Sequence, residues 1–364
     1  MNDLAPNSVL DLVCTIAVVI TILYNYRCMK KDEKGTSFWF FVIIIVLYSL
    51  FYRPADGDFW HYLELYELGD EGYVRHMENI YYWLINVLPH NYIIWRIAVW
   101  LPAAILIAIS MRMMKLPSSY AITSFLTFGL PAYYYTRNAL ALAILYLAVT
   151  VFCLKSKTTK RRSFLYIILF FLLAFSSWFF HRSMPLYILF AIISLVIPFR
   201  REYLLGALIG FPIMYEAIVL LAGDFLSFGE LWMSDDVGMN YLEQANMATV
   251  NWKGFIGLMI GYAPVLYFYY IAFFFPINKQ APEFQFYKSF LIFCFLLFYL
   301  SFLFYGQGSA SIQSRLYKST MIPFSFVVAI YFKYYLRTKR CRIFIDLFLV
   351  SIAFNIVIKI IGIL

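Results

Sequence analysis

Charge is scarce in this sequence. Only 13% of its 364 residues are Asp, Glu, Lys or Arg, 63% are hydrophobic, and the mean hydropathy is +0.76. A soluble globular chain averages about 25% charged residues and roughly half apolar ones. The composition therefore excludes a soluble globular domain, and the surplus of apolar side chains requires a lipid bilayer.

Cysteine and long polar stretches are scarce as well. The five cysteines form no CxxC pair, and each lies in an apolar run or in a basic loop beside one. This pattern is not that of a disulfide framework or a cysteine metal site, so we expect neither. No soluble domain interrupts the apolar runs. Residues 1–364 are therefore predicted to form a single polytopic membrane domain.

The sequence consists largely of long apolar runs. A spanning helix needs about 20 apolar residues, and only a helix satisfies its own backbone within such a run. We predict an all-α fold with about 12 transmembrane helices. The predicted spans are 8–26, 38–52, 91–111, 118–135, 136–154, 163–181, 183–199, 203–222, 254–275, 286–305, 317–336 and 343–362.

Lys and Arg concentrate in the loops on one side of these spans, where 20 of the 29 occur. Loops that stay in the cytoplasm carry the positive excess, so this side is predicted to be cytoplasmic and both termini external. The residues are spread over six short loops, so the net charge of +9 reflects topology and not nucleic-acid binding. They are Arg27, Lys30, Lys31, Lys34, Arg112, Lys115, Lys155, Lys157, Lys160, Arg161, Arg162, Arg200, Arg201, Lys279, Lys288, Lys333, Arg337, Lys339, Arg340 and Arg342.

Four arginines lie on the side opposite to this excess of Lys and Arg. Arg53, Arg137, Arg182 and Arg315 each lie at the outer end of a predicted span, in four separate loops. For any one of these positions, a snorkelling arginine is about as frequent as an arginine that binds a ligand. Four at one face indicate a bound anion, because the planar guanidinium suits the oxygens of a lipid diphosphate.

The outer loop 53–90 holds the most informative motif. Residues 51–66 read FYRPADGDFWHYLELY, and Asp58 can N-cap a short amphipathic helix there. Its apolar face would be Phe59, Tyr62, Leu63 and Tyr66, and its polar face Asp58, His61 and Glu64. Two interpretations stay open: an aromatic belt with solvated polar groups, or a general base beside a sugar hydroxyl.

Three further outer segments carry polar chemistry. In residues 180–185, FHRSMP, Ser183 is a candidate N-cap and Pro185 fits a first helical turn, which would put Arg182 beside free backbone N–H groups. Arg137 and Asn138 begin a predicted helix after three tyrosines, which we interpret as an interface belt. The loop 306–318 is predicted to be flexible at first and then basic, and the larger outer loop 223–253 suits a carbohydrate-facing lid.

These motifs resemble those of the EpsG family of bacterial polysaccharide polymerases, which are Wzy-like. Arg53 to Tyr62 resembles the family's Gly-Thr-Asp-Tyr motif, and the run 137–141, RNALA, is similar to its Arg-Gln-x-x-Ala step. Phe180-His181-x-Ser183 resembles its Phe-His-Pro-Ser motif, and the run 314–317, SRLY, its late Arg-rich turn. The departures are Gly57 for Thr, Phe59 for Tyr, Asn138 for Gln and Arg182 for Pro. The role of Arg182 is therefore not supplied by the family motif.

The resemblance implies a GT-C-like or Wzy-like helical bundle in a bacterial cytoplasmic membrane, with its active site on the periplasmic or extracellular side. It implies a glycosyltransferase that joins repeat units of O-antigen, capsule or exopolysaccharide. Donor and acceptor would both be undecaprenyl-diphosphate-linked oligosaccharides, and no cofactor, nucleotide sugar or metal is needed. Membrane lipid, a chain-length regulator and a flippase of the same pathway are the other expected partners.

The motifs and the resemblance together predict two groups of site residues. We expect catalysis from Asp58, His181 and Arg137, and substrate binding from Arg53, Arg182, Arg315, His61, Tyr62, Asn138 and Ser183. Asp58 is the first choice for the base that deprotonates the acceptor hydroxyl, with a helix cap as its alternative role. His181 is either that base or an orienting donor to the diphosphate.

Two other functions remain as alternatives. A flippase for lipid-linked oligosaccharides also has many spans and interior arginines, but it should place charges along a central cavity at membrane depth. A non-catalytic component of polysaccharide export is the other.

The first testable prediction concerns orientation. A single cysteine placed beside Asp235 should react with a membrane-impermeant thiol reagent added outside intact cells, and one beside Lys160 should react only after the membrane is opened. The physical reason is the one-sided distribution of Lys and Arg. The reverse labelling pattern would contradict the orientation and every outer-face role derived from it.

Overall fold

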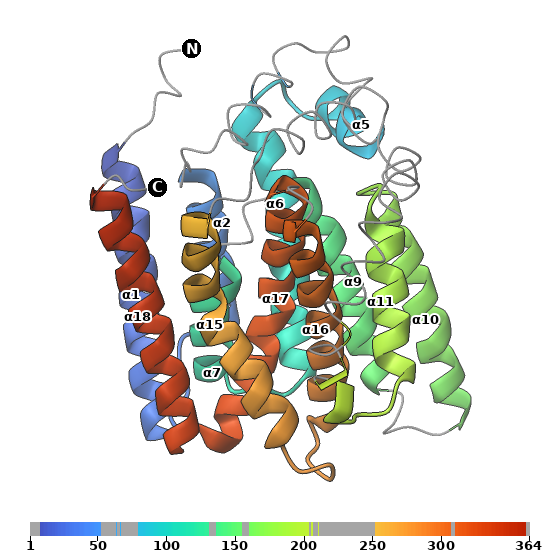
Figure 1. Ribbon diagram of the computed structural model, residues 1–364. Helices are drawn as coiled ribbons and strands as arrows, with labels where there is room; N and C mark the ends of the chain where they lie inside the picture. The colour runs from blue at the N-terminus through green and yellow to red at the C-terminus, as the bar shows by residue number, and fades with distance from the viewer. Residues whose placement is uncertain are drawn as a thin grey trace. The chain divides into compact units, whose positions relative to one another are not determined.

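The computed structural model describes residues 8–51, 63, 66, 79–130, 136–154, 160–203, 205–206, 210, 252–306 and 310–361. Every regular element in these ranges is a helix, and no strand occurs within them. The predicted all-α fold is thus confirmed for this part of the chain (Figure 1). The helices are α1 (Ser8–Lys31), α2 (Phe38–Phe51), α5 (Asn79–Val87), α6 (Tyr92–Met113), α7 (Ser118–Ser124), the π-helical segment η2 (Phe125–Gly129), α9 (Thr136–Leu154), α10 (Lys160–Trp178), α11 (Met184–Val196), α15 (Trp252–Phe274), α16 (Phe284–Gly306), α17 (Ala310–Tyr335) and α18 (Lys339–Ile361).

Three of the described helices are long and apolar enough to cross a membrane, by length and composition. They are Leu12–Lys31 in α1, Tyr92–Met113 in α6 and Phe284–Ser301 in α16. Shorter apolar helices accompany them: Phe38–Leu50, Asn138–Leu154, Ser163–Trp178, Met184–Val196 and Gly261–Phe274. These helices are those expected of a membrane protein, because a segment in lipid must pair its backbone groups internally.

The chain divides into two compact units, each described by itself. Unit 1 comprises Met1–Val196, Gln285–Phe293 and Lys318–Ile330. Unit 2 comprises Ile197–Phe284, Cys294–Tyr317 and Tyr331–Leu364. Helix α16 therefore contributes its N-terminal part from Gln285 to unit 1, and helix α17 contributes its middle segment; the other residues of both helices belong to unit 2.

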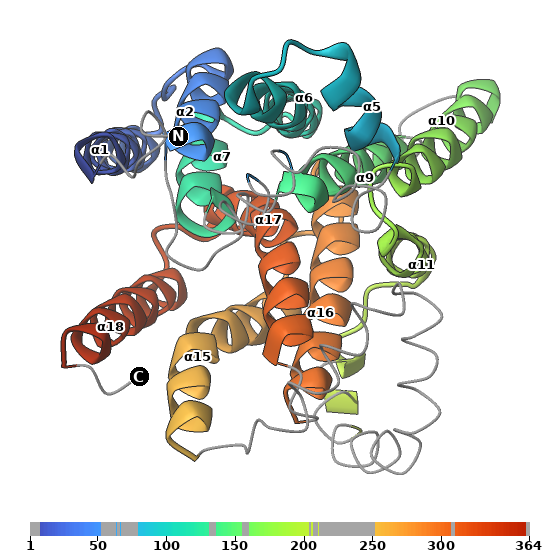
Figure 2. The same cartoon turned by 90° about the horizontal axis from the view of Figure 1, so that it is seen from above.

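Unit 1 is a row of packed helices. Contacts join α1 to α2, α2 to α6, α6 to α9, and α9 to α10, and Figure 2 shows these helices in that order. Helix α6 begins where the side chain of Asn91 accepts hydrogen bonds from the backbone N–H groups of Ile93 (2.9 Å) and Ile94 (3.2 Å), which is N-capping. Its residues Trp95, Val99 and Ala103 are fully buried at four-residue spacing, so α6 presents one continuous face to its neighbours.

The predicted span 118–135 is not one regular α-helix. Helix α7 changes at Phe125 into the π-helical segment η2, which ends at Gly129. A Cβ atom on Gly129 would lie 3.0 Å from the Phe125 ring and 3.3 Å from the Ser325 hydroxyl of α17. Glycine permits this close approach, and hydropathy alone carries no signal for the widened turn.

Two further expectations are corrected. Helix α17 begins at Ala310, so residues 310–318 are helical rather than a loop; Ser, Gln and Arg tolerate a helix well beyond the apolar run. Helix α5 lies within the segment 53–90, and its nine residues are too few to span a membrane. Lys288, assigned to a basic loop, is buried within α16.

A proline inside α17 leaves one backbone carbonyl without its usual donor, and a tyrosine supplies it. Pro323 has no N–H to give to the carbonyl of Ser319, four residues earlier. The Tyr146 hydroxyl of α9 donates to that carbonyl at 2.9 Å, and the Tyr187 hydroxyl of α11 donates to the Ser319 hydroxyl at 3.2 Å. All four residues belong to unit 1. The proline break in α17 is thereby stabilised by α9 and α11.

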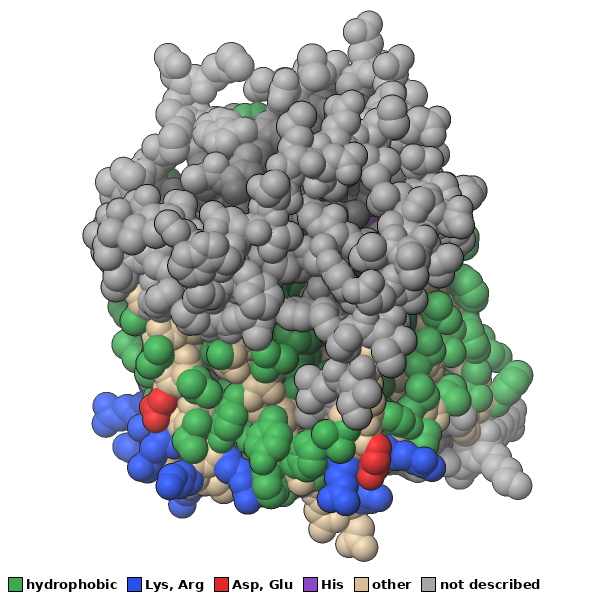
Figure 3. Space-filling view, viewed as in Figure 1, with side chains coloured by type: hydrophobic (Ala, Val, Ile, Leu, Met, Phe, Trp, Pro, Cys, Tyr) green, Lys and Arg blue, Asp and Glu red, His purple; other side chains and the backbone are tan. Residues whose placement is uncertain are grey.

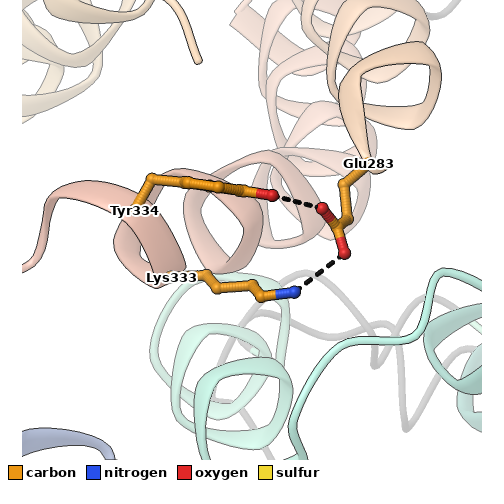
Figure 4. Close-up of polar contacts among 3 residues, drawn as sticks. All are labelled: Glu283, Lys333 and Tyr334. Atoms are coloured by element: carbon orange, nitrogen blue, oxygen red, sulfur yellow. Dashed lines mark hydrogen bonds and ion pairs between the residues drawn. The ribbon is translucent and has the colours of Figure 1, made fainter. Parts of the chain in front are cut away.

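In unit 2, a buried carboxylate ties the segment between α15 and α16 to the end of α17. Glu283, which is 2% exposed, accepts hydrogen bonds from Lys333 Nζ (2.8 Å) and the Tyr334 hydroxyl (2.5 Å), as Figure 4 shows. Burial alone would raise the pKa of Glu283, but the hydrogen bonds from Lys333 and Tyr334 outweigh it and hold the pKa below its ordinary value. The carboxylate is therefore charged and paired near neutral pH.

The link between Tyr146 and Pro323 is testable as a double-mutant cycle. Tyr146→Phe should cost about 0.5–1.5 kcal/mol of unfolding free energy, because it removes the hydroxyl that donates to the Ser319 carbonyl. In a Pro323→Ala background the cost should be smaller, since the substituted alanine would offer its own N–H to that carbonyl. Reversible unfolding in mixed detergent micelles measures all four proteins.

Tyr331→Phe is the matched control for this cycle. Its hydroxyl approaches the Ile271 carbonyl at 3.5 Å, but that carbonyl already accepts the N–H of Phe275 at 2.9 Å. Its loss should cost less than the loss of the Tyr146 hydroxyl and should not depend on Pro323. An equal cost of Tyr146→Phe in both backgrounds would contradict the proposed link.

The Glu283 contacts predict a pH dependence of stability. A carboxyl whose pKa is lower in the folded state stabilises the protein above its unfolded pKa, and this contribution is lost as pH falls through the folded value. Thermal unfolding between pH 7 and pH 3 should therefore show a larger acid-dependent loss for the parent protein than for Glu283→Gln. Glu33→Gln, at an exposed position, is the control; equal losses in parent and Glu283→Gln would show that Glu283 does not contribute.

Candidate functional site

Unit 1 gathers its basic turns at one end. The Ser119 hydroxyl donates to the Glu33 carbonyl (3.1 Å), and the Tyr120 hydroxyl donates to the Asp32 carboxylate (3.1 Å). These contacts bring together the turn after α1 and the turn after α6, which carry Lys34 and Lys115. On the face drawn in Figure 3, the coloured Lys and Arg side chains gather along the lower edge, with hydrophobic side chains between and above them.

The other end of unit 1 holds the end of α2, the start of α6 and the turn between α10 and α11. We call it the His181 end. Its best-defined contact is made by Arg96 of α6, which is 4% exposed and donates through Nη2 to the Ser49 carbonyl at 2.6 Å. Ser49 lies in the last turn of α2, where carbonyls lack intrahelical donors. The guanidinium also lies 4.4 Å from the centre of the Trp100 ring. Arg96 therefore caps α2 and is held by aromatic rings.

Aromatic side chains connect the segment before α6 to the His181 turn. Tyr66 packs against the rings of His90 (5.1 Å) and Trp95 (6.1 Å), and the Trp95 indole donates to the Tyr81 carbonyl (3.4 Å). Tyr81 in turn meets Phe180 edge to face at 6.4 Å. The position of the turn that holds His181 is thus tied to α5 and α6 by ring packing.

The His181 turn has a defined ring geometry. The Ser183 N–H donates to His181 Nδ1 (3.2 Å), and the Ser183 hydroxyl lies 2.7 Å from the same nitrogen. A ring nitrogen that accepts an N–H does not carry a proton, so the neutral ring carries its proton on Nε2. Nε2 is then a donor. This arrangement suits a hydrogen bond to a phosphate oxygen better than proton abstraction.

Arg182 and the start of α11 complete this turn. Arg182 is exposed, and α11 begins at Met184 with Pro185 as its second residue. The Met184 N–H donates to the His181 carbonyl at 3.1 Å. Ser183 precedes α11 as expected of an N-cap, but its hydroxyl contacts the His181 ring. One short turn thus presents an imidazole N–H and a guanidinium beside a helix start, which favours an anion.

The remaining predicted site residues are placed less completely. Asp58, Arg53, His61 and Tyr62 lie outside the described residues. Arg137 is the second residue of α9 and Arg315 lies in the first turns of α17, but the described part of the chain does not include their side chains. Of the ten predicted residues, the structure therefore brings together His181, Arg182 and Ser183.

Asn138 stands apart from this turn as the third residue of α9. Its Oδ1 atom is buried and accepts no hydrogen bond from the residues that the structure describes. An amide oxygen in this condition is a candidate acceptor for a substrate hydroxyl.

Sequence reasoning did not assign functions to the buried cations. Arg96 caps α2, and Lys288 of α16 donates from Nζ to the Leu195 carbonyl (3.1 Å) in the last turn of α11. The sequence did contain a signal for these contacts: a charged residue inside an apolar run needs a polar partner within the protein. Among the described residues, no group of three or more His, Cys, Asp or Glu side chains is placed to hold a metal ion.

The ring geometry of His181 is directly measurable. In protein labelled with ¹⁵N-histidine, the neutral His181 ring should show an unprotonated Nδ1 and a protonated Nε2, with His181→Gln used for assignment. Ser183→Ala removes one of the two contacts to Nδ1 and should increase the other tautomer. A neutral ring protonated on Nδ1 in the parent protein would contradict the geometry.

No match to this chain is found among models of protein families, characterised proteins or solved structures. Function is therefore inferred from the residues and their geometry.

Proposed function

We propose that this chain is a polytopic glycosyltransferase of a bacterial cytoplasmic membrane, with about 12 spans. It polymerises undecaprenyl-diphosphate-linked oligosaccharide repeat units into O-antigen, capsule or exopolysaccharide at the outer face. The bond between the growing chain's anomeric carbon and the diphosphate oxygen breaks. The anomeric carbon is transferred to a hydroxyl of the incoming unit, whose proton goes to a base.

The observation that carries this proposal is the His181 turn. Its Nε2–H and the exposed Arg182 are suited to the diphosphate leaving group, on which negative charge develops as the bond breaks. Ser183 fixes the ring so that the donor is preorganised. The motif similarity at residues 180–183 supports the same assignment.

The other proposed roles follow from chemistry. Asp58 is the proposed base, because neutral sugar hydroxyls are poor nucleophiles and positioned proton transfer contributes about 10²–10⁴-fold. Arg137 and Arg315 are proposed to hold the diphosphate with Arg53, and Asn138 to accept a hydrogen bond from a sugar hydroxyl. His181 then orients and stabilises the leaving group.

The buried cations disfavour the flippase alternative. A flippase needs charged side chains facing a central cavity to carry the diphosphate through the membrane. In unit 1 the buried Arg96 and Lys288 instead donate to carbonyls in the last turns of α2 and α11. Arg96 and Lys288 therefore stabilise helix ends. The proposed contacts with the anion are made at the His181 end.

A deletion strain tests the reaction class. Cells lacking this chain should accumulate single lipid-linked repeat units in the outer leaflet, because the units arrive but are not joined. Units trapped in the inner leaflet would indicate a flippase, and normal polymer would indicate a non-catalytic component.

Complementation of that strain separates the residue roles. Asp58→Asn keeps a capping oxygen but loses basicity, so it should lower polymer formation by about 10²-fold or more at normal protein levels. His181→Gln retains an N–H donor and should keep more activity than His181→Ala. Parental elongation by folded Asp58→Asn protein would show that the base lies elsewhere.

A further inference from the structure

Helix α11 is held by polar contacts at two places along its length. In its last turn, the Leu195 carbonyl accepts a hydrogen bond from Lys288 Nζ of α16 at 3.1 Å. Near its start, the Tyr187 hydroxyl donates to the Ser319 hydroxyl of α17 at 3.2 Å. Tyr187 and Ser319 are 4% and 5% exposed, so this second contact is buried. It is also the contact nearer to the His181 turn.

The His181 turn is joined directly to the first turn of α11. The Met184 N–H donates to the His181 carbonyl at 3.1 Å, and the Ser183 N–H donates to His181 Nδ1 at 3.2 Å. Met184 is fully buried, and Tyr187 follows it by three residues, which is about 4.5 Å along the helix axis. The position of the turn therefore depends on where the bond from Tyr187 holds the start of α11.

Helix α9 contacts the same serine through a different atom. The Tyr146 hydroxyl donates to the Ser319 carbonyl at 2.9 Å, so the carbonyl and the hydroxyl of one residue hold two helices. Asn138 lies eight residues before Tyr146 on α9, about 12 Å along the axis. Because α9 and α10 are successive and pack side by side, α9 starts at the same end of unit 1 as the turn after α10 (Figure 1). Ser319 thus relates the position of Asn138 to that of the His181 turn.

We infer that Tyr187 and Ser319 are positioning residues for the proposed glycosyl transfer. Their hydrogen bond holds the His181 turn at the depth and rotation, relative to Asn138, that the reaction requires. This inference rests on the proposed function, in which His181 and Arg182 contact the leaving diphosphate and Asn138 contacts a sugar hydroxyl. These contacts come from different helices, and a misplacement of about 1 Å can lower a rate by about 10²-fold.

Steady-state kinetics of purified, folded variants tests this role. Tyr187→Phe removes the donor hydroxyl and should lower kcat by about tenfold or more. KM should change much less, since every group that contacts the bound substrate is retained. Ser319→Ala should have the same effect, and the double variant no further effect, because both substitutions remove one bond. Ser194→Ala is the matched control: its buried hydroxyl also belongs to α11 but donates within the helix, to the Ala191 carbonyl at 2.7 Å, so kcat should not change.

Hydrogen exchange measures the same contact without turnover. Tyr187→Phe should speed exchange of the Met184 amide hydrogen by about 2–10-fold, because the start of α11 opens more often without this bond. Ser194→Ala should leave this rate unchanged. The tautomer of the neutral His181 ring should stay as in the parent protein, since Ser183 sets it within the turn. A lower kcat with an unchanged tautomer would therefore show that the turn is displaced rather than disrupted.

Two results would overturn the inference while the polymerase proposal stands. One is a parental kcat in folded Tyr187→Phe protein, and the other is a Met184 exchange rate that does not respond to this substitution. Failure of the proposed function gives a different result. If the parent protein elongates no chains, the polymerase proposal and the catalytic role of the bond both fail, whereas faster Met184 exchange would still show that Tyr187 holds the turn.

Discussion

The pairing of backbone carbonyls that helix ends and a proline leave without donors is the constraint on which unit 1 depends. Buried groups of this kind are out of reach of water, so side chains supply the donors. Arg96 donates to the Ser49 carbonyl in α2, Lys288 to Leu195 in α11 and Tyr146 to Ser319, four residues before Pro323. Each donor comes from another helix. The same contacts therefore stabilise a helix terminus or break and fix which helices are neighbours.

This constraint bears on function because the buried cations supply two of these hydrogen-bond donors. Arg96 and Lys288 are occupied by carbonyls of α2 and α11. At the opposite end of unit 1 from its basic turns, the His181 turn presents Arg182 at the surface and a histidine ring oriented by Ser183. An anionic substrate that approaches this end meets preorganised donors, while the buried charges maintain the helices that hold the turn in place.

Local patterns were predictable from the sequence, and pairings between distant residues were not. The start of α9 at Thr136 and of α11 near Ser183 follow from breaks between apolar runs and from capping residues. The π-helical segment that begins at Phe125 ends at Gly129, where Ser325 of α17 approaches closely, and this contact between distant residues has no sequence signal. The contacts of Glu283 with Lys333 and of Tyr146 with Ser319 join residues 50 and 173 positions apart. In the candidate site, the grouping of His181 to Ser183 was predictable because the residues are adjacent; the proton position on the ring required the Ser183 geometry.

The central claim is that this chain joins lipid-diphosphate-linked sugars at one membrane face. Reconstitution of the purified protein into vesicles, with lipid-linked repeat units added only to the outer surface, tests it most directly. Using vesicles in which the protein faces the added substrate, the account predicts oligomers of increasing length, with one free undecaprenyl diphosphate released for each linkage formed. Transfer of intact repeat units to the vesicle interior without elongation, or unchanged repeat units after prolonged incubation, would contradict it.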